Sequence, residues 1–129
     1  MTQITGRADC GNSPKNLLLQ ELTIAIACAD MQSIANLVSD DVSWLPAGGE
    51  AVAGVAAVCE AITREGPAAS VTIDHVISHG KAGAVDGVIV YGRTSRAFCH
   101  VFEFTTANGT HVRRIVSYAD RDKPSTIDI

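Results

Sequence analysis

The chain has 129 residues, of which 47% are apolar and 19% charged, and its formal net charge is −4. This length suits one domain around a single core, and the acidic balance disfavours nucleic acid as the main partner. No run approaches the roughly 20 apolar residues that cross a bilayer, and the N-terminus lacks the apolar stretch of a secretion signal, so we expect a cytoplasmic protein without membrane contact.

The chain opens with a polar stretch and two helical patterns. Residues 1–13 are expected to form a flexible N-terminal tail. Ser13-Pro14 is a typical helix start, because a capping hydroxyl is followed by proline in the first turn. Apolar residues then recur at helical spacing over Leu18–Ala29. Asp30 is placed to cap a second, short helix over Met31–Val38.

A short strand and a third helix follow. Ser39-Asp40-Asp41 is expected to end the second helix and turn into a strand at Val42–Leu45. Pro46-Ala47-Gly48-Gly49 ends that strand. Gly54 then opens a third helix over residues 55–65.

From Ala69 onward the apolar pattern changes to a period of two, which is typical of strands. Four strands are predicted, at Val71–His79, Ala84–Arg93, Ala97–Thr106 and Val112–Asp120. Their short connections require antiparallel neighbours, and three helices must cover one face of the sheet. The prediction is an α+β domain over residues 14–122, followed by a C-terminal tail over residues 123–129.

The strand at Ala97–Thr106 has the most informative face of the chain. Alternation places Phe98, His100, Phe102 and Phe104 on one side, so all three phenylalanines share a face with one histidine. Such a face lines either a core or an apolar pocket that contains a single titratable group.

The cysteines and histidines give no sign of a metal site. The four cysteines are scattered, at Cys10, Cys28, Cys59 and Cys99. They are predicted to be small, mostly buried side chains in a reducing compartment. His75 and His79 lie in a predicted strand, where four residues span roughly 13 Å, too far for one metal ion. We expect no metal and no cofactor.

Three segments carry a family resemblance: IACADMQSIANLVSDDVSWLPAGG, AGVAAVCEAI and FEFTTANGTHVRRIVSYAD. With the order of helices and strands, they resemble the nuclear transport factor 2-like superfamily, which includes ketosteroid isomerases, SnoaL-like polyketide cyclases and limonene epoxide hydrolases. The resemblance implies a cone, in which helices pack on a bent, antiparallel or mixed sheet and an apolar pocket lies at the open end. It also implies a homodimer formed through the outer face of the sheet.

The isomerase machinery is mostly missing from the matching positions. Ketosteroid isomerases use a carboxylate base, a tyrosine and a protonated aspartic acid. The base position matches Leu45, or Trp44 if the register slips by one; the tyrosine position matches Leu22; and the acid position matches His100. Neither leucine takes or shares a proton, so the resemblance does not imply the isomerase reaction.

The epoxide hydrolase machinery is missing in the same way. Those enzymes surround a water molecule with an Asp–Arg–Asp set, and the matching inward positions here are Gly87, Ile89 and Ser117. None of these side chains is a base that binds and activates water, so the hydrolase mechanism is not predicted.

His100 is therefore the one candidate catalytic residue, with Tyr91 or Ser117 as possible assistants. An imidazole titrates near neutral pH, and burial in an apolar pocket would lower its pKa and favour the neutral form. The predicted ligand pocket is lined by Leu22, Trp44, Leu45, Ile89, Tyr91, Phe98, Phe102, Ile115 and Ser117.

Three functions follow from this set of residues. The first is a non-catalytic domain that binds a small apolar or mildly polar molecule in the cone. The second is an isomerase, cyclase or dehydratase in which His100 handles the proton. The third is an assembly module whose pocket is filled by its own side chains, namely Trp44, Leu45, Phe98, Phe102 and Phe104. A cavity of a few hundred cubic ångströms would favour binding.

Overall fold

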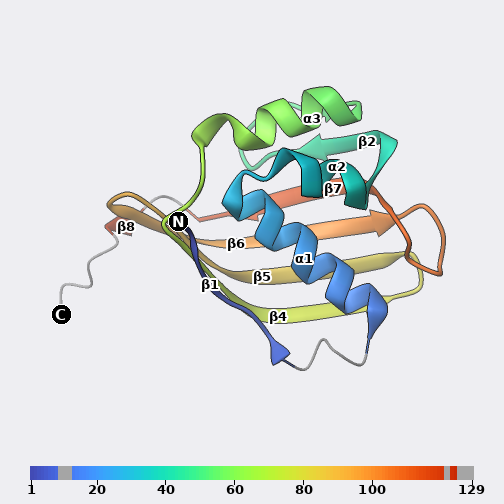
Figure 1. The fold of residues 1–129 in the computed structure, drawn as a ribbon, viewed down its shortest axis with the longest axis horizontal. Helices are drawn as coiled ribbons and strands as arrows, with labels where there is room; N and C mark the ends of the chain where they lie inside the picture. The colour runs from blue at the N-terminus through green and yellow to red at the C-terminus, as the bar shows by residue number, and fades with distance from the viewer. Residues whose placement is uncertain (9–12, 121–122, 125–129) are drawn as a thin grey trace.

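Three α-helices cover one face of a curved sheet, as Figure 1 shows. The computed structural model describes residues 1–8, 13–120 and 123–124, and within these ranges the chain forms α1, α2, α3, a short 3₁₀ helix η2 and eight strands. The α+β class predicted from the sequence is confirmed. None of the helices in the described part of the chain is both long and apolar enough to cross a membrane.

The first two helices begin at the predicted caps. Ser13 precedes α1 (Pro14–Cys28), and its hydroxyl accepts a hydrogen bond from a backbone N–H of the first turn at 3.3 Å. Asp30 precedes α2 (Met31–Leu37), and its carboxylate accepts a backbone hydrogen bond in the same way. Each cap satisfies an N–H group that the helix itself leaves without a partner.

The third helix is shorter than predicted. Gly54, whose φ of 93° suits a glycine, precedes α3 (Val55–Ile62). The last predicted turn forms η2 (Thr63–Glu65), a tighter 3₁₀ helix, instead of continuing as α-helix. This change of geometry places Glu65 at the edge of the cavity described below.

The sheet is mixed. Its strands are β1 (Gln3–Thr5), β2 (Val38–Leu45), β3 (Val52–Ala53), β4 (Ser70–His79), β5 (Ala82–Tyr91), β6 (Thr94–Phe104), β7 (Val112–Ala119) and β8 (Lys123–Pro124). They lie in the order β1-β4-β5-β6-β7-β2-β3, and β8 pairs with β6. β1 with β4 and β2 with β7 are parallel, and the other pairs are antiparallel. The four long strands predicted from the sequence are confirmed within three residues at each end.

Four strands differ from the sequence-based prediction. β3 forms in a segment for which no element was predicted. β1 and β8 form in segments predicted to be tails, and the domain boundaries themselves stay a prediction. β2 starts at Val38, so Ser39-Asp40-Asp41 is strand rather than turn. Val38 and Val42 are both buried, and their even spacing suits one face of a strand as well as one face of a helix.

The core lies between the helices and the inner face of the sheet. In Figure 1, α1 crosses β4, β5 and β6, while α2 and α3 lie over β7 and β2. The largest fully buried side chains include Leu19, Leu22, Ile34, Phe102, Phe104 and Ile115. On β6 the predicted alternation is confirmed, because His100 and the three phenylalanines are buried whereas Val101 is 40% exposed.

Gly87 marks the closest approach of two strands. The register of β4 against β5 shifts between Ile73 and His75, which face Gly87 and Asp86. A Cβ atom on Gly87 would lie 1.9 Å from the carbonyl oxygen of Thr72. Only glycine fits there without a shift of the backbone, and the register irregularity lies directly beside it.

Candidate functional site

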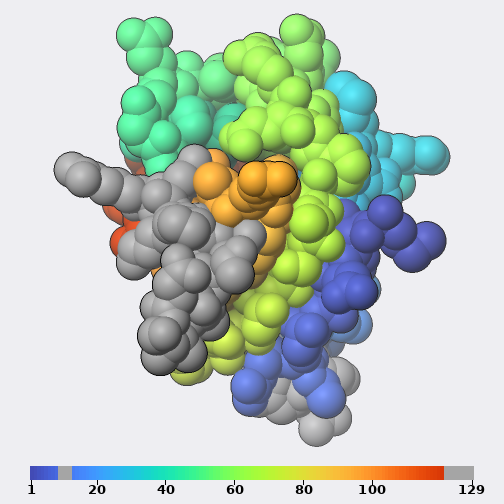
Figure 2. All heavy atoms as spheres, turned by 90° about the vertical axis from the view of Figure 1, so that its left-hand side faces the viewer, coloured from blue at the N-terminus to red at the C-terminus, as the bar shows by residue number. Residues whose placement is uncertain are grey.

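A partly open pocket lies at the end of the sheet where β2, β5 and β7 finish and β6 begins. Its volume is about 140 Å³. It is lined by Ile26, Trp44, Pro46, Ala47, Ala61, Ile62, Glu65, Ile89, Tyr91, Arg96, Phe98, His100, Ser117, Tyr118 and Ala119. We call it the His100 pocket. Figure 2 looks at this end of the molecule and shows the β5–β6 connection, in orange, directly against the segment after α3, in light green.

His100 is the buried titratable group of the pocket. Its ring lies between those of Phe98 and Phe102, with centroid distances of 5.0 and 5.9 Å. Burial lowers the pKa of His100 from 6.5 to about 4, because the charged imidazolium would lose its hydration. The imidazole is therefore neutral near pH 7, and it offers one N–H donor and one acceptor nitrogen.

Ser117 joins His100 to Trp44. Its Oγ lies 2.7 Å from Nδ1 of His100 and accepts a hydrogen bond from Nε1–H of Trp44 at 2.9 Å. The three residues come from three adjacent strands, because β7 lies between β6 and β2. His100 and Ser117 are direct partners in the ladder of β6 and β7. The sheet therefore positions the whole chain of hydrogen bonds.

A balanced pair of charges lies at the rim of the pocket. The guanidinium of Arg96 is 3.8 Å from the carboxylate of Glu65 and 5.6 Å from the ring centre of Tyr91. Burial raises the pKa of Tyr91, and the negative charge of Glu65 raises it further, while Arg96 acts in the opposite direction. The Tyr91 hydroxyl thus stays protonated at neutral pH.

The structure brings most of the predicted pocket residues together with His100. Trp44, Ile89, Tyr91, Phe98 and Ser117 all line the His100 pocket. They come from β2, β5, β6 and β7, and alternation along each strand turns them toward the helices.

The other predicted pocket residues lie elsewhere. Leu22, Phe102 and Ile115 are fully buried in the core and do not line the His100 pocket. Leu45 is 38% exposed on the opposite face of the sheet. Of the two alternatives at the end of β2, Trp44 is therefore the residue that faces the pocket.

Two charged pocket residues were missed by the sequence analysis. Arg96 shares the face of Phe98 and His100 by simple alternation, so extending the predicted strand by one residue toward the N-terminus would have found it. No pattern in the sequence indicates that Glu65 belongs to the pocket. Its place at the rim depends on how η2 packs against the start of β6.

The described residues provide no metal site. No group of three or more His, Cys, Asp or Glu side chains in residues 1–8, 13–120 and 123–124 is placed to hold a metal ion. Cys28, Cys59 and Cys99 are free thiols, and burial raises the pKa of the last two. Cys10 lies outside the described residues.

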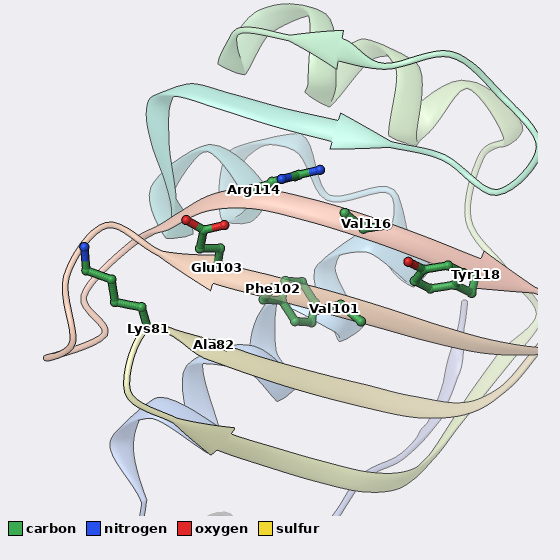
Figure 3. Close-up of a pocket in the computed structure, with 8 residues that line it drawn as sticks. All are labelled: Lys81, Ala82, Val101, Phe102, Glu103, Arg114, Val116 and Tyr118. Carbon is green, nitrogen blue, oxygen red and sulfur yellow. The ribbon is translucent and has the colours of Figure 1, made fainter.

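A second, larger hollow lies on the outer face of the sheet. It measures about 380 Å³ and is lined by Lys81, Ala82, Val101, Phe102, Glu103, Arg114, Val116 and Tyr118. Figure 3 shows Val101 and Val116 side by side on this face, with charged groups at one end and Tyr118 at the other. The hollow is shallow and more open than the His100 pocket, so we take the smaller but deeper His100 pocket as the candidate ligand site.

The fold has close counterparts among solved structures. A nuclear transport factor 2-like protein of unknown function from Burkholderia xenovorans superposes with a TM-score of 0.74 at 16% identity, over 93% of this chain and 98% of that one. An LEH-like epoxide hydrolase from M. tuberculosis gives 0.66 at 17% identity, over 82% of each chain. A protein with a ketosteroid isomerase-like fold from Catenulispora acidiphila, in complex with trimethylamine, gives 0.66 at 13% identity, over 78% of this chain and 83% of that one.

No family model and no curated protein matches the sequence. The likeness is one of fold, because the superpositions cover most of each chain at 13–17% identity. It confirms the resemblance predicted from the sequence: the chain has the fold of the nuclear transport factor 2-like superfamily.

Proposed function

We propose that the chain binds a small, neutral and mainly apolar molecule in the His100 pocket. The observation that carries this proposal is a partly open pocket, more apolar than polar, with a buried neutral histidine in its wall. A polar group at that depth is costly to bury unless it serves the fold or a ligand. The wall of the pocket combines apolar side chains with a few convergent polar groups, as small-molecule sites do, but the pocket's volume of about 140 Å³ is below the few hundred cubic ångströms that such sites usually have.

The volume of the cavity limits the size of the ligand. At about 140 Å³ the pocket is smaller than most ligand sites. Cavities of about 150 Å³ accommodate a molecule of the size of benzene. A single ring, or one end of a larger molecule that extends past the rim, therefore fits this space.

The charges of the pocket support a neutral ligand. His100 is uncharged near neutral pH. At the rim, the guanidinium of Arg96 lies 3.8 Å from the carboxylate of Glu65, so each of these charges already faces an opposite one. A charged ligand would lose its hydration without meeting an opposite charge of its own, whereas a neutral one would not.

The same facts favour binding over catalysis. A general acid or base works best when its pKa lies near the operating pH. His100, with a pKa of about 4, is a weak base at neutral pH. The isomerase, cyclase or dehydratase alternative therefore has less support. The alternative of a pure assembly module also has less support, because Trp44 and Phe98 border the cavity without filling it.

An NMR titration with small cyclic ketones, ethers and arenes tests the proposal. We expect saturable shifts of backbone amides on β5, β6 and β7 around the pocket. Ala61, on α3, lines the pocket, so Ala61→Leu should fill the cavity and abolish the shifts. Ala57→Leu makes the same change at an exposed position of the same helix, and it should leave the titration unaltered.

A bound ligand must also stabilise the folded state. At a hundredfold excess over the dissociation constant the gain is about 2.7 kcal/mol, which raises the midpoint of thermal unfolding. Shifts that persist unchanged in Ala61→Leu would place the binding site elsewhere and contradict the proposal. Absence of any shift across the set, with the protein folded, would favour the assembly role.

We also propose a second copy of the chain as the partner of the outer face of the sheet. Five apolar residues form a row across this face: Ile77, Ala84, Val101, Val116 and Leu45 are neighbours in the ladders of β4, β5, β6, β7 and β2. Ile77 is 64% exposed and Val101 is 40% exposed. An exposed apolar row over five strands is typical of an interaction surface.

Sedimentation equilibrium tests this partner. We expect a dimer in the wild type and a monomer in Val101→Asp, because a buried unpaired carboxylate opposes association. Leu17→Asp, at a position on α1 that is also 40% exposed, is the control and should remain dimeric. A monomeric wild type would overturn the homodimer.

A cytoplasmic location stays a prediction. It is supported by the free thiols Cys28, Cys59 and Cys99 among the described residues, since oxidising compartments favour disulfides.

A further inference from the structure

Ser117 is a junction that determines which nitrogen of His100 carries the hydrogen. An indole is only a donor, so Nε1–H of Trp44 must donate to Ser117 Oγ across their 2.9 Å contact. The serine hydroxyl then still has its own hydrogen to donate and one lone pair to offer. Nδ1 of His100, at 2.7 Å, is the second partner.

Two arrangements of hydrogens satisfy the contact between Ser117 and His100. In the first, the serine hydroxyl donates to an unprotonated Nδ1, and the histidine hydrogen sits on Nε2. In the second, Nδ1–H donates to Oγ, and the serine hydrogen needs another acceptor. The described residues place no other acceptor within hydrogen-bond distance of Oγ. Each arrangement makes the same number of hydrogen bonds. The first leaves one group without a partner in the described part of the protein, the Nε2–H of His100, whereas the second leaves two, the serine hydroxyl hydrogen and the lone pair of Nε2. Because each unsatisfied group adds a cost, the first arrangement is favoured.

Nε2 of His100 is the atom that meets a ligand. It makes no hydrogen bond within the described part of the protein. In that part, every side-chain nitrogen or oxygen atom without accessible surface has a hydrogen-bond partner. Because Nε2 has no partner, it must have accessible surface, and the open space beside His100 is the His100 pocket.

From this geometry we infer that Ser117, held by Trp44, is a positioning residue that fixes His100 as the Nε2–H tautomer and makes the His100 pocket selective for ligands with a hydrogen-bond acceptor. The inference about the ligand rests on the proposed function; the inference about the tautomer does not. A carbonyl or ether oxygen meets the N–H group, whereas a ligand that has only a donor, or no polar atom, leaves it without a partner.

The tautomer can be measured on the free protein. Long-range proton–nitrogen correlation spectra distinguish a bare ring nitrogen from a protonated one, and the wild type is expected to show a bare Nδ1 and a protonated Nε2. Ser117→Ala should give a mixture of tautomers. Ser117→Thr keeps the hydroxyl and should restore the wild-type pattern. A protonated Nδ1 in the wild type, or an unchanged pattern in Ser117→Ala, would overturn the positioning role.

Ligand selectivity is tested with two molecules of the same shape, cyclohexanone and methylenecyclohexane, of which only the first has an acceptor. We expect cyclohexanone to bind roughly fivefold more tightly in NMR titrations, as one neutral hydrogen bond predicts. This preference should shrink in Ser117→Ala and persist in Ser117→Thr. Equal binding of the two probes to the wild type would overturn the selectivity. If the tautomer is as expected and neither probe binds, the positioning role stands and the proposed binding function fails.

Discussion

His100 and Ser117 face each other directly across β6 and β7, with Nδ1 of the histidine 2.7 Å from Oγ of the serine. The pair keeps a polar contact in a region otherwise filled by the rings of Phe98 and Phe102. A hydrogen bond is stronger among apolar side chains than in water, and losing it there leaves a buried polar group without a partner. The contact between His100 and Ser117 therefore affects both the stability of the fold and the protonation of the imidazole in the pocket.

The first prediction concerns the dependence of stability on pH. The pKa of His100 is about 4 in the folded state and 6.5 in the unfolded chain, so between these values the unfolded state binds more protons. The free energy of unfolding should therefore fall as the pH is lowered from 6.5 to 4, by about 3 kcal/mol in total. Urea unfolding at a series of pH values measures this slope.

The control for the pH dependence is a pair of histidine variants. His100→Phe removes the titrating group and should flatten the slope, even if the variant is less stable at neutral pH. His79 is exposed on β4, and His79→Gln should keep the wild-type slope. A slope that is the same in His100→Phe and in the wild type would show that other groups cause it.

The second prediction concerns Gly87. A methyl group there would lie 1.9 Å from the carbonyl oxygen of Thr72, which is backbone and has no rotamer with which to move away. Gly87→Ala should lower the free energy of unfolding by at least about 2 kcal/mol, because overpacked sites force the backbone to shift. Ala82→Val enlarges an exposed residue of the same strand and should be tolerated. Equal stability of the two variants would mean that β4 and β5 separate easily.

The third prediction tests the two faces of β6. Phe102 is fully buried, whereas its neighbour Val101 is 40% exposed. Phe102→Ala should cost about 3–5 kcal/mol through lost burial and an internal cavity. Val101→Ala should change the stability of the monomer by about 0.5 kcal/mol or less. Chemical unfolding at low protein concentration measures both, and a comparable loss in both variants would contradict the assignment of the inner face.

The fourth prediction uses Trp44 as a reporter. It is the only tryptophan of the chain, and it lines the His100 pocket. A ligand that displaces water beside the indole should shift the emission to shorter wavelength with a saturable dependence on concentration. The shift should be lost in Ala61→Leu and retained in Ala57→Leu. A titration that moves pocket amides in NMR but leaves the emission unchanged would place the ligand away from Trp44.

Much of the fold could be predicted because local patterns reveal it. Ser13 and Asp30 cap helices by contacts within a few residues of the chain, and the period of two along β4 to β7 follows from the pleat. The face shared by Phe98, His100 and the other phenylalanines is likewise a local property of one strand.

Long-range pairing was not visible in the sequence. The three-residue strand β1 exists because it pairs in parallel with β4, about 65 residues later in the chain. The extension of β2 back to Val38 depends in the same way on its pairing with β7. Short segments of this kind carry too few residues for a period to be recognised.

The sequence by itself determined the α+β class, the inner face of β6 and the place of His100 on that face. Only the tertiary structure decided that Ser117 bridges His100 and Trp44, that Glu65 meets Arg96 at the rim, and that Leu22 and Ile115 lie in the core rather than line the pocket. The reason is physical: alternation states which way a side chain points, whereas its depth and its partners depend on the curvature of the sheet and on the helices packed against it.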